Sequence, residues 1–294
     1  MEPKLRTVVL ATDFSAGARR AMERIPGLGL TANHRVLLAH VWDESLWQQA
    51  KALFGAQLRA GALQEAAEKE LAAWQAELER RAAVRVVTHL LRGSPTEEIV
   101  ALARAEQADL IVLGGYGEHR LRDLLLGGTA LAVLSGSPCA VLAVRRDGAG
   151  AYANVLIATD LSDTSARAVK TALALFPGAS HRLLHAYQVP FESRLRMGGA
   201  GEEEIAHFRE RAAQEAARRL EAFAADCGPE AAQRLSRSAV FGHPTSVIHE
   251  AVRQGAPDLL VLGRHRGSRL EERVLGSVTQ HALYYAPCDL LLVP

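Results

Sequence analysis

The 294-residue chain carries one sequence pattern twice, so its fold must let each half form a domain of the same kind. Residues 93–114 align with residues 242–263 at an offset of 149, without a gap. The identical pairs are Gly93/Gly242, Pro95/Pro244, Thr96/Thr245, Ile99/Ile248, Arg104/Arg253, Asp109/Asp258, Leu110/Leu259, Val112/Val261, Leu113/Leu262 and Gly114/Gly263. The two halves also begin alike (V-L-A-T-D-F-S, L-I-A-T-D-L-S) and end alike (S-P-C-A-V-L-A-V, A-P-C-D-L-L-L-V). We conclude that one domain has been duplicated.

Length and duplication together predict two domains, residues 1–147 and residues 148–294. A domain of about 150 residues is long enough to bury a hydrophobic core of its own. The boundary falls in the polar, glycine-containing segment 145–151, which we expect to be the linker.

Charge and hydropathy exclude several classes of partner. The chain has 34 basic and 33 acidic residues and no basic tract, so we expect no nucleic-acid partner. No apolar run approaches the roughly 18 to 20 residues that span a bilayer, so we expect no membrane partner. The chain shows no signal-peptide core, and its three cysteines are few for a disulfide framework. We therefore expect a cytoplasmic protein.

Apolar runs alternate with amphipathic stretches in both halves. In the first half, continuous apolar runs predict buried strands at 5–11, 36–41, 84–91, 109–114 and 140–144. Apolar residues three and four apart predict a long helix in each half: Leu63, Ala67, Leu71, Trp74 and Leu78, then Ile205, Phe208, Ala212, Ala216, Leu220 and Phe223. Each half is thus predicted to be an α/β domain, a doubly wound five-stranded parallel sheet.

In such sheets, ligands bind beyond the carboxyl ends of the strands, where the strand order reverses. This rule selects the loops after the first, second and fourth strands of each half. These loops begin at Asp13, Val41 and Gly114 in the first half and at Asp160, Ala186 and Gly263 in the second.

The loop after the fourth strand is rich in spaced glycines. The first copy reads G-G-Y-G-E-H-R-L-R-D-L-L-L-G-G-T over residues 114–129, and the second reads G-R-H-R-G-S-R-L-E-E-R-V-L-G-S-V over residues 263–278. Glycine lets a backbone approach a polyanion closely, and the N-terminus of the following helix favours phosphate. Turns after strands also use glycine for conformational reasons alone, so the pattern by itself leaves both interpretations open.

With these motifs the chain resembles the universal stress protein family in its tandem two-domain form. The resemblance rests on the A-T-D-x-S start, the G-x-P segment, D-L-I-V-L-G or its counterpart, the glycine loop and the final S-P-C or A-P-C strand. It implies a Rossmann-like fold of the adenine nucleotide alpha hydrolase type and dimer formation through the last strand. In one branch of the family it also implies ATP, with Mg²⁺ accompanying the phosphates. The other branch binds no ATP.

The family's nucleotide pattern is G-x-x-G, nine residues, and then glycine followed by Ser or Thr. The first copy matches it at Gly114, Gly117 and Gly127. It departs at Gly128, where a hydroxyl is expected, and Thr129 is displaced by one position. The missing hydroxyl removes about one hydrogen bond, roughly 0.5 to 1.5 kcal/mol.

The second copy departs from the pattern in a different place. It matches at Gly263, Gly276 and Ser277, but carries Arg266 where the second glycine belongs. The bulk of an arginine blocks phosphates, whereas its guanidinium is able to hold them in a bidentate manner. On this balance we favour the first domain as the ATP site.

One aspartate follows the first strand of each half, and two roles are open for each. The resemblance implies that Asp13 and Asp160 lie near the adenine and ribose, with Val41 lining the base pocket. Independently of any ligand, Asp13 or Ser15 is a typical helix cap. The two roles are compatible, and the smaller Ala186 at the position of Val41 again favours the first copy.

Other chemistry-bearing residues favour structural roles. Cys139 and Cys288 occupy matching strand starts and are expected to pack, whereas Cys227 has no counterpart and is open to exposure. His40 and His185 are expected to be half-buried strand residues. Neither metal-ligand spacing nor a nucleophile or Walker motif occurs, so we expect no catalytic or metal residues.

Three functions remain. The leading one is an ATP-binding stress sensor or regulator that is not an enzyme, or at most a slow ATPase. The second is a scaffold of the same fold that binds no nucleotide, and the third, an ATP-using transferase or ligase, lacks a motif to support it. We also expect the domains to pair through their apolar last strands, 140–144 and 289–293, because a bare apolar sheet edge invites association. Further dimerisation of the whole chain is a second expectation.

Overall fold

A computed structural model describes residues 5–43, 60–115, 128–148, 150–189, 192–199, 201–264 and 275–294. The first half contains β1 (Thr7–Thr12), α1 (Ala16–Arg24), the 3₁₀ turn η1 (Ile25–Leu28), β2 (Arg35–Trp42), α3 (Ala60–Ala82), β3 (Arg85–Arg92), α4 (Pro95–Ala105), β4 (Leu110–Gly114), α5 (Gly128–Gly136) and β5 (Ala140–Val144). Strands and helices alternate, as the apolar runs predict.

The second half repeats this order. It contains β6 (Asn154–Thr159), α6 (Asp163–Leu175), β7 (Ser180–Tyr187), α7 (Glu192–Met197), α8 (Glu202–Asp226), α9 (Pro229–Arg234), β8 (Leu235–Phe241), α10 (Pro244–Gly255), β9 (Leu259–Gly263), α11 (Ser277–Tyr285) and β10 (Asp289–Val293). None of the helices in the described ranges combines the length and apolar character needed to cross a membrane.

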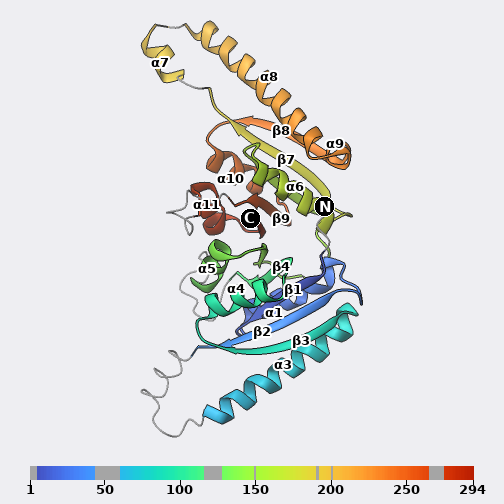
Figure 1. Cartoon of the computed structure of the whole chain (residues 1–294). Coiled ribbons are helices and arrows are strands. Elements are labelled where there is room, and N and C mark those ends of the chain that lie inside the picture. The colour runs from blue at the N-terminus through green and yellow to red at the C-terminus, as the bar shows by residue number, and fades with distance from the viewer. Residues whose placement is uncertain are drawn as a thin grey trace.

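All ten strands form one sheet in the order β3-β2-β1-β4-β5-β10-β9-β6-β7-β8. Within each half the strands are parallel, and the second half reads in mirror order across the middle of the sheet. Each half is therefore a doubly wound five-stranded domain, which confirms the predicted α/β fold. Figure 1 shows the long helices α3 and α8 at opposite ends of the molecule.

Both faces of the central strands are buried, and each face has one hydrophobic core that runs through both halves. The edge strands β3 and β8 are mostly half-buried or exposed, so the strand expected to be buried at 84–91 is buried only in part, because no strand covers its outer edge. Alternate residues of the two central strands enter different cores: Leu142 and Leu291 face one side, and Val141 and Leu290 the other. Helices α1, α3, α6 and α8 supply the first core, whereas α4, α5, α10 and α11 supply the second. This burial on two faces explains why the central strands are largely apolar.

One expected core residue of the long helices is exposed. Its spacing predicts that Phe208 lies on the apolar face of α8, but 42% of its surface is accessible. The first part of α8 extends beyond the sheet, as Figure 1 shows, so the apolar face has no sheet beneath it there. Leu220 and Phe223, nearer the other end of the helix, are buried.

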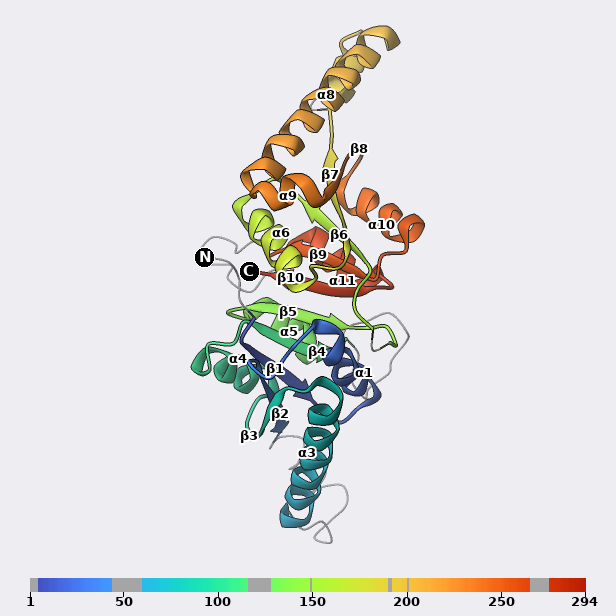
Figure 2. The same cartoon turned by 90° about the vertical axis from the view of Figure 1, so that its right-hand side faces the viewer.

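The two halves join at β5 and β10, which pair antiparallel in the middle of the sheet (Figure 2). Leu290 lies opposite Ala143, Leu291 opposite Leu142, and Leu292 opposite Val141. Both strands are buried along their whole length. The two final strands thus cover each other's edge.

A buried carboxylate anchors the linker to the seam between the two halves, the line along which β5 pairs with β10. Asp289 is fully buried; its Oδ1 accepts the backbone N–H groups of Arg145 (2.7 Å) and Arg146 (2.9 Å), and its Oδ2 accepts the hydroxyl of Tyr152 (2.7 Å). The guanidinium of Arg24 lies 3.3 Å from Oδ2 and stacks on the Tyr152 ring, 4.7 Å from its centroid. Burial and the neighbouring Asp289 raise the pKa of Tyr152 well above its ordinary value. The Asp289 carboxylate of the last strand therefore binds groups from both the first helix and the linker.

Two buried arginines cross the seam in opposite directions. Arg145 follows β5 and donates to the carbonyls of Leu283 (2.6 Å) and Ala286 (2.5 Å), at the C-terminal end of α11. Arg264 follows β9 and donates to the carbonyls of Leu134 (2.6 Å) and Ser137 (2.6 Å), at the C-terminal end of α5. A cation at a helix C-terminus satisfies free carbonyls and complements the helix dipole.

We predict that Asp289→Ala lowers the free energy of unfolding by about 3–5 kcal/mol, because it leaves the buried Arg24 cation without its counter-charge and the Tyr152 hydroxyl without its acceptor. Asp289→Asn retains an oxygen acceptor, so its free energy of unfolding should lie between those of Asp289→Ala and the wild type. Chemical denaturation measures these differences. The control is Glu215→Ala, which removes an exposed pair with Arg218 on α8 and should change nothing measurable. A wild-type midpoint for Asp289→Ala would disprove the anchoring role.

Candidate functional site

The strand order reverses between β1 and β4 in the first half and between β6 and β9 in the second. The carboxyl ends of these strands carry the predicted residues Asp13 and Gly114, and Asp160 and Gly263. A switch point of this kind opens a crevice for ligands in doubly wound sheets. Each half therefore has one candidate site, and the two can be compared residue by residue.

The turn after β1 is held by three successive side-chain caps. Thr12 Oγ1 accepts the N–H of Phe14 (2.9 Å), Asp13 Oδ1 accepts that of Ser15 (3.0 Å), and Ser15 Oγ accepts that of Ala18 (3.2 Å). Phe14 has a positive φ of 61°, so these bonds hold a backbone conformation that is rare for a phenylalanine. Ser15 is the N-cap of α1, which confirms the capping role expected at this position.

The second half builds the same turn and adds hydrogen bonds to the Ser165 hydroxyl, which accepts the N–H of Asp160 at 3.3 Å. Thr159 and Asp160 accept the N–H groups of Leu161 (2.9 Å) and Ser162 (3.1 Å), and Leu161 has a φ of 66°. Here, however, the hydroxyl of Ser165 also donates to Asp160 Oδ1 at 2.6 Å. The corresponding residue of the first half is Ala18, which has no hydroxyl.

The two aspartates are therefore not equivalent. Both are exposed, but the Asp160 carboxylate is held by a short bond from its own helix. Within the described part of the chain, the Asp13 carboxylate accepts only the Ser15 N–H. One Asp13 oxygen is thus free to accept a hydrogen bond from a ligand.

An aromatic group lies beside the Asp13 turn. The Phe14 ring is 4.5 Å from the His40 ring and 5.6 Å from that of Trp74, measured between centroids. His40 donates from Nδ1 to the Thr12 carbonyl at 2.8 Å, and His185 makes the matching bond to Thr159 at 3.0 Å. Both histidines are half-buried and structural, as expected from the sequence.

The residues at the ends of the second strands pack on the core. Val41 and Ala186 are both half-buried, and both touch the hydrophobic core that α4 and α10 help to form. The structure therefore gives these two residues a packing role, with Val41 offering the larger apolar surface.

The first glycine of each loop is required by the fold. A Cβ on Gly114 would lie 2.4 Å from the backbone carbon of Gly17 in α1. A Cβ on Gly263 would lie 3.0 Å from the matching carbon of Thr164 in α6. The first turn of a helix thus packs directly on the end of the neighbouring strand, and this contact explains both glycines without any ligand.

The residue after each of these glycines differs between the halves. Gly115 in the first half corresponds to Arg264 in the second. Each donates its backbone N–H to the carbonyl at the end of the last strand of its own half, Val144 at 2.7 Å and Val293 at 2.6 Å. A Cβ on Gly115 would lie 2.7 Å from Cγ of Arg145. The Arg145 stem therefore fills the space beside Gly115, whereas Arg264 sends its own side chain across the seam to α5.

The far end of each glycine loop opens a helix, as predicted. Gly128 and Thr129 begin α5 and are exposed; Gly276 is the N-cap of α11, and Ser277 is its first residue. The middle of each loop, including Gly117, Gly127 and Arg266, lies outside the described residues. The N–H groups of the first turns of α5 and α11 are the donors that these exposed ends present.

The cysteines occupy apolar surroundings. Burial raises the pKa of Cys139 and of Cys288 to about 11, which keeps both as thiols at neutral pH. Cys227, for which the sequence left exposure open, is 7% exposed, because the C-terminal end of α8 packs against α9. Across the described ranges, no three His, Cys, Asp or Glu side chains are grouped to hold a metal ion.

The sheet order and the paired switch points define a tandem doubly wound α/β protein. The model of the universal stress protein family matches the chain twice, at residues 4–145 and 151–294, and the chain belongs to that family. This confirms the resemblance carried by the repeated motifs.

Individual relatives agree with this assignment. Universal stress protein MJ0531 of Methanocaldococcus jannaschii is 41% identical over 63 residues, which are 21% of this chain and 37% of that protein. Universal stress protein MJ0577 of the same organism is 29% identical over 161 residues, which are 50% of this chain and 98% of that protein. The crystal structure of a universal stress protein from Archaeoglobus fulgidus has a TM-score of 0.70 at 18% identity and covers 99% of this chain and 98% of its own, a likeness of fold.

We predict that Gly114→Ala lowers the free energy of unfolding by roughly 1–3 kcal/mol, because the new methyl group has to displace backbone in α1. Gly263→Ala should cost less, since its nearest contact is 0.6 Å longer. Denaturant titration of the two variants tests this ranking. Equal denaturation midpoints for both variants would show that the shorter contact at Gly114 does not make a side chain there more destabilising than at Gly263.

Proposed function

We propose that this chain is a tandem universal stress protein with domains at 1–147 and 148–294, and that its first domain binds ATP or a related adenine nucleotide. In this proposal the bound nucleotide reports a condition of the cell, and the protein acts as a sensor or regulator. The cytoplasm is the compartment we expect.

The observation that carries the choice of the first domain is the difference between the two aspartates. Asp13 keeps an exposed carboxylate oxygen beside the switch point, suited to accept a hydrogen bond from a ribose hydroxyl or an adenine amino group. Asp160 is bonded at 2.6 Å by Ser165 and has to break that bond to serve the same purpose. Val41 adds an apolar wall that the smaller Ala186 reduces.

The phosphates are proposed to lie at the other end of the same crevice. Gly114, Gly117 and Gly127 follow the family's spacing, and Gly128 and Thr129 present the first N–H groups of α5. A helix N-terminus favours an anion through its free donors and its dipole. Mg²⁺, if it accompanies the phosphates, would then be held mainly by the nucleotide itself and by water.

The second domain keeps Gly263, Gly276 and Ser277 but differs where its loop begins. Arg264 ties the start of this loop to the end of α5. Arg266 stands where the family has a glycine. We propose that these two arginines and the Ser165 bond make the second domain a poor nucleotide site.

The protein is proposed to bind rather than to turn over its nucleotide. Its sequence carries no recognised nucleophile motif or Walker motif, so any hydrolysis should be slow. The pairing of β5 with β10 is proposed to take the place of the dimer contact that the family resemblance implies, and a homodimer of whole chains stays a prediction. A scaffold that binds no nucleotide is the alternative.

We predict that Asp13→Ala weakens ATP binding by about 1–3 kcal/mol, through the loss of one ligand hydrogen bond. Asp160→Ala is the matched control, because it removes the same turn cap from the other domain, and it should leave the affinity unchanged. Isothermal titration calorimetry with ATP measures both.

Gly117→Val should abolish binding, since a side chain there would project toward the phosphates, whereas Ser277→Val should not affect it. If Ser277→Val or Asp160→Ala removes binding and Asp13→Ala does not, the site belongs to the second domain. Absence of binding by the wild type at millimolar ATP supports the scaffold.

A further inference from the structure

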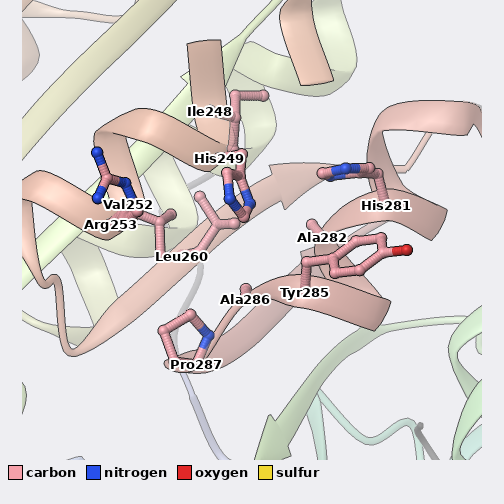
Figure 3. Close-up of a pocket in the computed structure, with 10 residues that line it drawn as sticks. All are labelled: Ile248, His249, Val252, Arg253, Leu260, His281, Ala282, Tyr285, Ala286 and Pro287. Atoms are coloured by element: carbon pink, nitrogen blue, oxygen red, sulfur yellow. The ribbon is translucent and has the colours of Figure 1, made fainter. Parts of the chain in front are cut away.

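The second domain has a small pocket between α10 and α11 (Figure 3). Its volume is about 140 Å³, and its floor is apolar, formed by Ile248, Val252, Leu260 and Ala282. Ser277, at the candidate phosphate end of α11, is not among the lining residues, which come from the later turns of that helix.

Three rings line the pocket, which is open to solvent, since His249 is exposed and Tyr285 is 53% exposed. The His249 and His281 rings are 5.7 Å apart at 81°, and the Tyr285 ring lies 4.6 Å from His281 and 6.3 Å from His249. In Figure 3 the two imidazoles approach each other from different helices. Within the described residues, neither imidazole has a hydrogen-bond partner, so their ring nitrogens are available to a ligand.

The duplication provides an internal comparison for these rings. At the matching places, α4 and α5 of the first domain carry Val100, Ala132 and Gly136. Helices α5 and α11 both have nine residues and both pack beside a counterpart, α4 or α10. Because the same fold forms without the rings, packing does not require them.

The charge at the rim favours a neutral ligand. Arg253 lines the pocket, but its guanidinium makes two bonds to the Glu250 carboxylate, at 2.8 and 3.0 Å. The cation is therefore compensated by an acid on the same helix. An anionic ligand would have to compete with Glu250, whereas an uncharged hydroxyl needs only an imidazole nitrogen.

We propose that this pocket binds a neutral monocyclic phenol. An apolar cavity of about 150 Å³ holds one benzene ring, so the volume suits a single six-membered ring. The ring would rest on the apolar floor and pack against His281 and Tyr285 in a tilted or edge-on arrangement. Its hydroxyl would donate to, or accept from, a ring nitrogen of His249 or His281.

The probe is 4-methylphenol, titrated into the whole protein while the imidazole proton signals are followed by nuclear magnetic resonance. We expect saturable shifts of two histidine signals with one site per chain. His281→Ala, which installs the first domain's residue, should weaken binding at least fivefold. Tyr284→Ser, which also installs the first domain's residue but lies outside the lining, should stay within twofold.

Two further measurements separate the pocket from general surface binding. Ala282→Leu fills the floor and should remove the saturable shift while circular dichroism shows an intact fold. Benzoate, of similar size but charged, should bind at least fivefold more weakly than 4-methylphenol. Non-saturable shifts, wild-type binding in both His281→Ala and Ala282→Leu, or tighter binding of benzoate would each overturn the proposal. None of these results depends on ATP.

Discussion

The buried Asp289 carboxylate at the junction of β5 and β10 is the interaction on which the relation between the two domains depends. It receives backbone donors from the linker, the Tyr152 hydroxyl and the Arg24 cation, so it connects the last strand to the first helix and to the segment between the domains. Its counterpart in the first domain is Ala140. One such charge needs several donors to be stable in the core, and the linker supplies two of them, the N–H groups of Arg145 and Arg146. The duplicated domains are therefore joined by an asymmetric contact.

This junction also places the beginnings of the two glycine loops. Because β5 and β10 are antiparallel, Arg145 reaches the end of α11 and Arg264 reaches the end of α5. The two arginines come from non-equivalent sequence positions, yet each satisfies helix carbonyls of the other domain. The two arginines affect the two glycine loops differently. Arg145 lies outside the first loop and packs beside Gly115, whereas Arg264 is itself the second residue of the second loop. The proposed preference for the first domain follows from this difference together with the Asp13 turn.

The fold could be predicted from the sequence because its signals are local. Apolar strands, Pro95 and Pro244 at helix starts, and the repeat itself are all visible in the printed residues. Many identical repeat residues serve the backbone: Asp109 and Asp258 accept N–H groups at the start of β1 and β6, and Gly93 and Gly242 have φ values of 138° and 144°. Their identity therefore predicts the fold and does not by itself indicate a ligand.

The site could be predicted only in part. The caps at Asp13 and Ser15 follow from residue type. The bond from Ser165 to Asp160 could not be predicted in the same way, because it depends on how α6 packs against the turn. The sequence does show that Ser165 is replaced by Ala18 at the matching position of the first half. The buried arginines were not predictable, since their acceptors lie more than a hundred residues away. The stoichiometry of ATP binding to the wild-type chain, measured by calorimetry, tests the central claim most directly. One nucleotide per chain agrees with a single site in the first domain, and two per chain contradicts it.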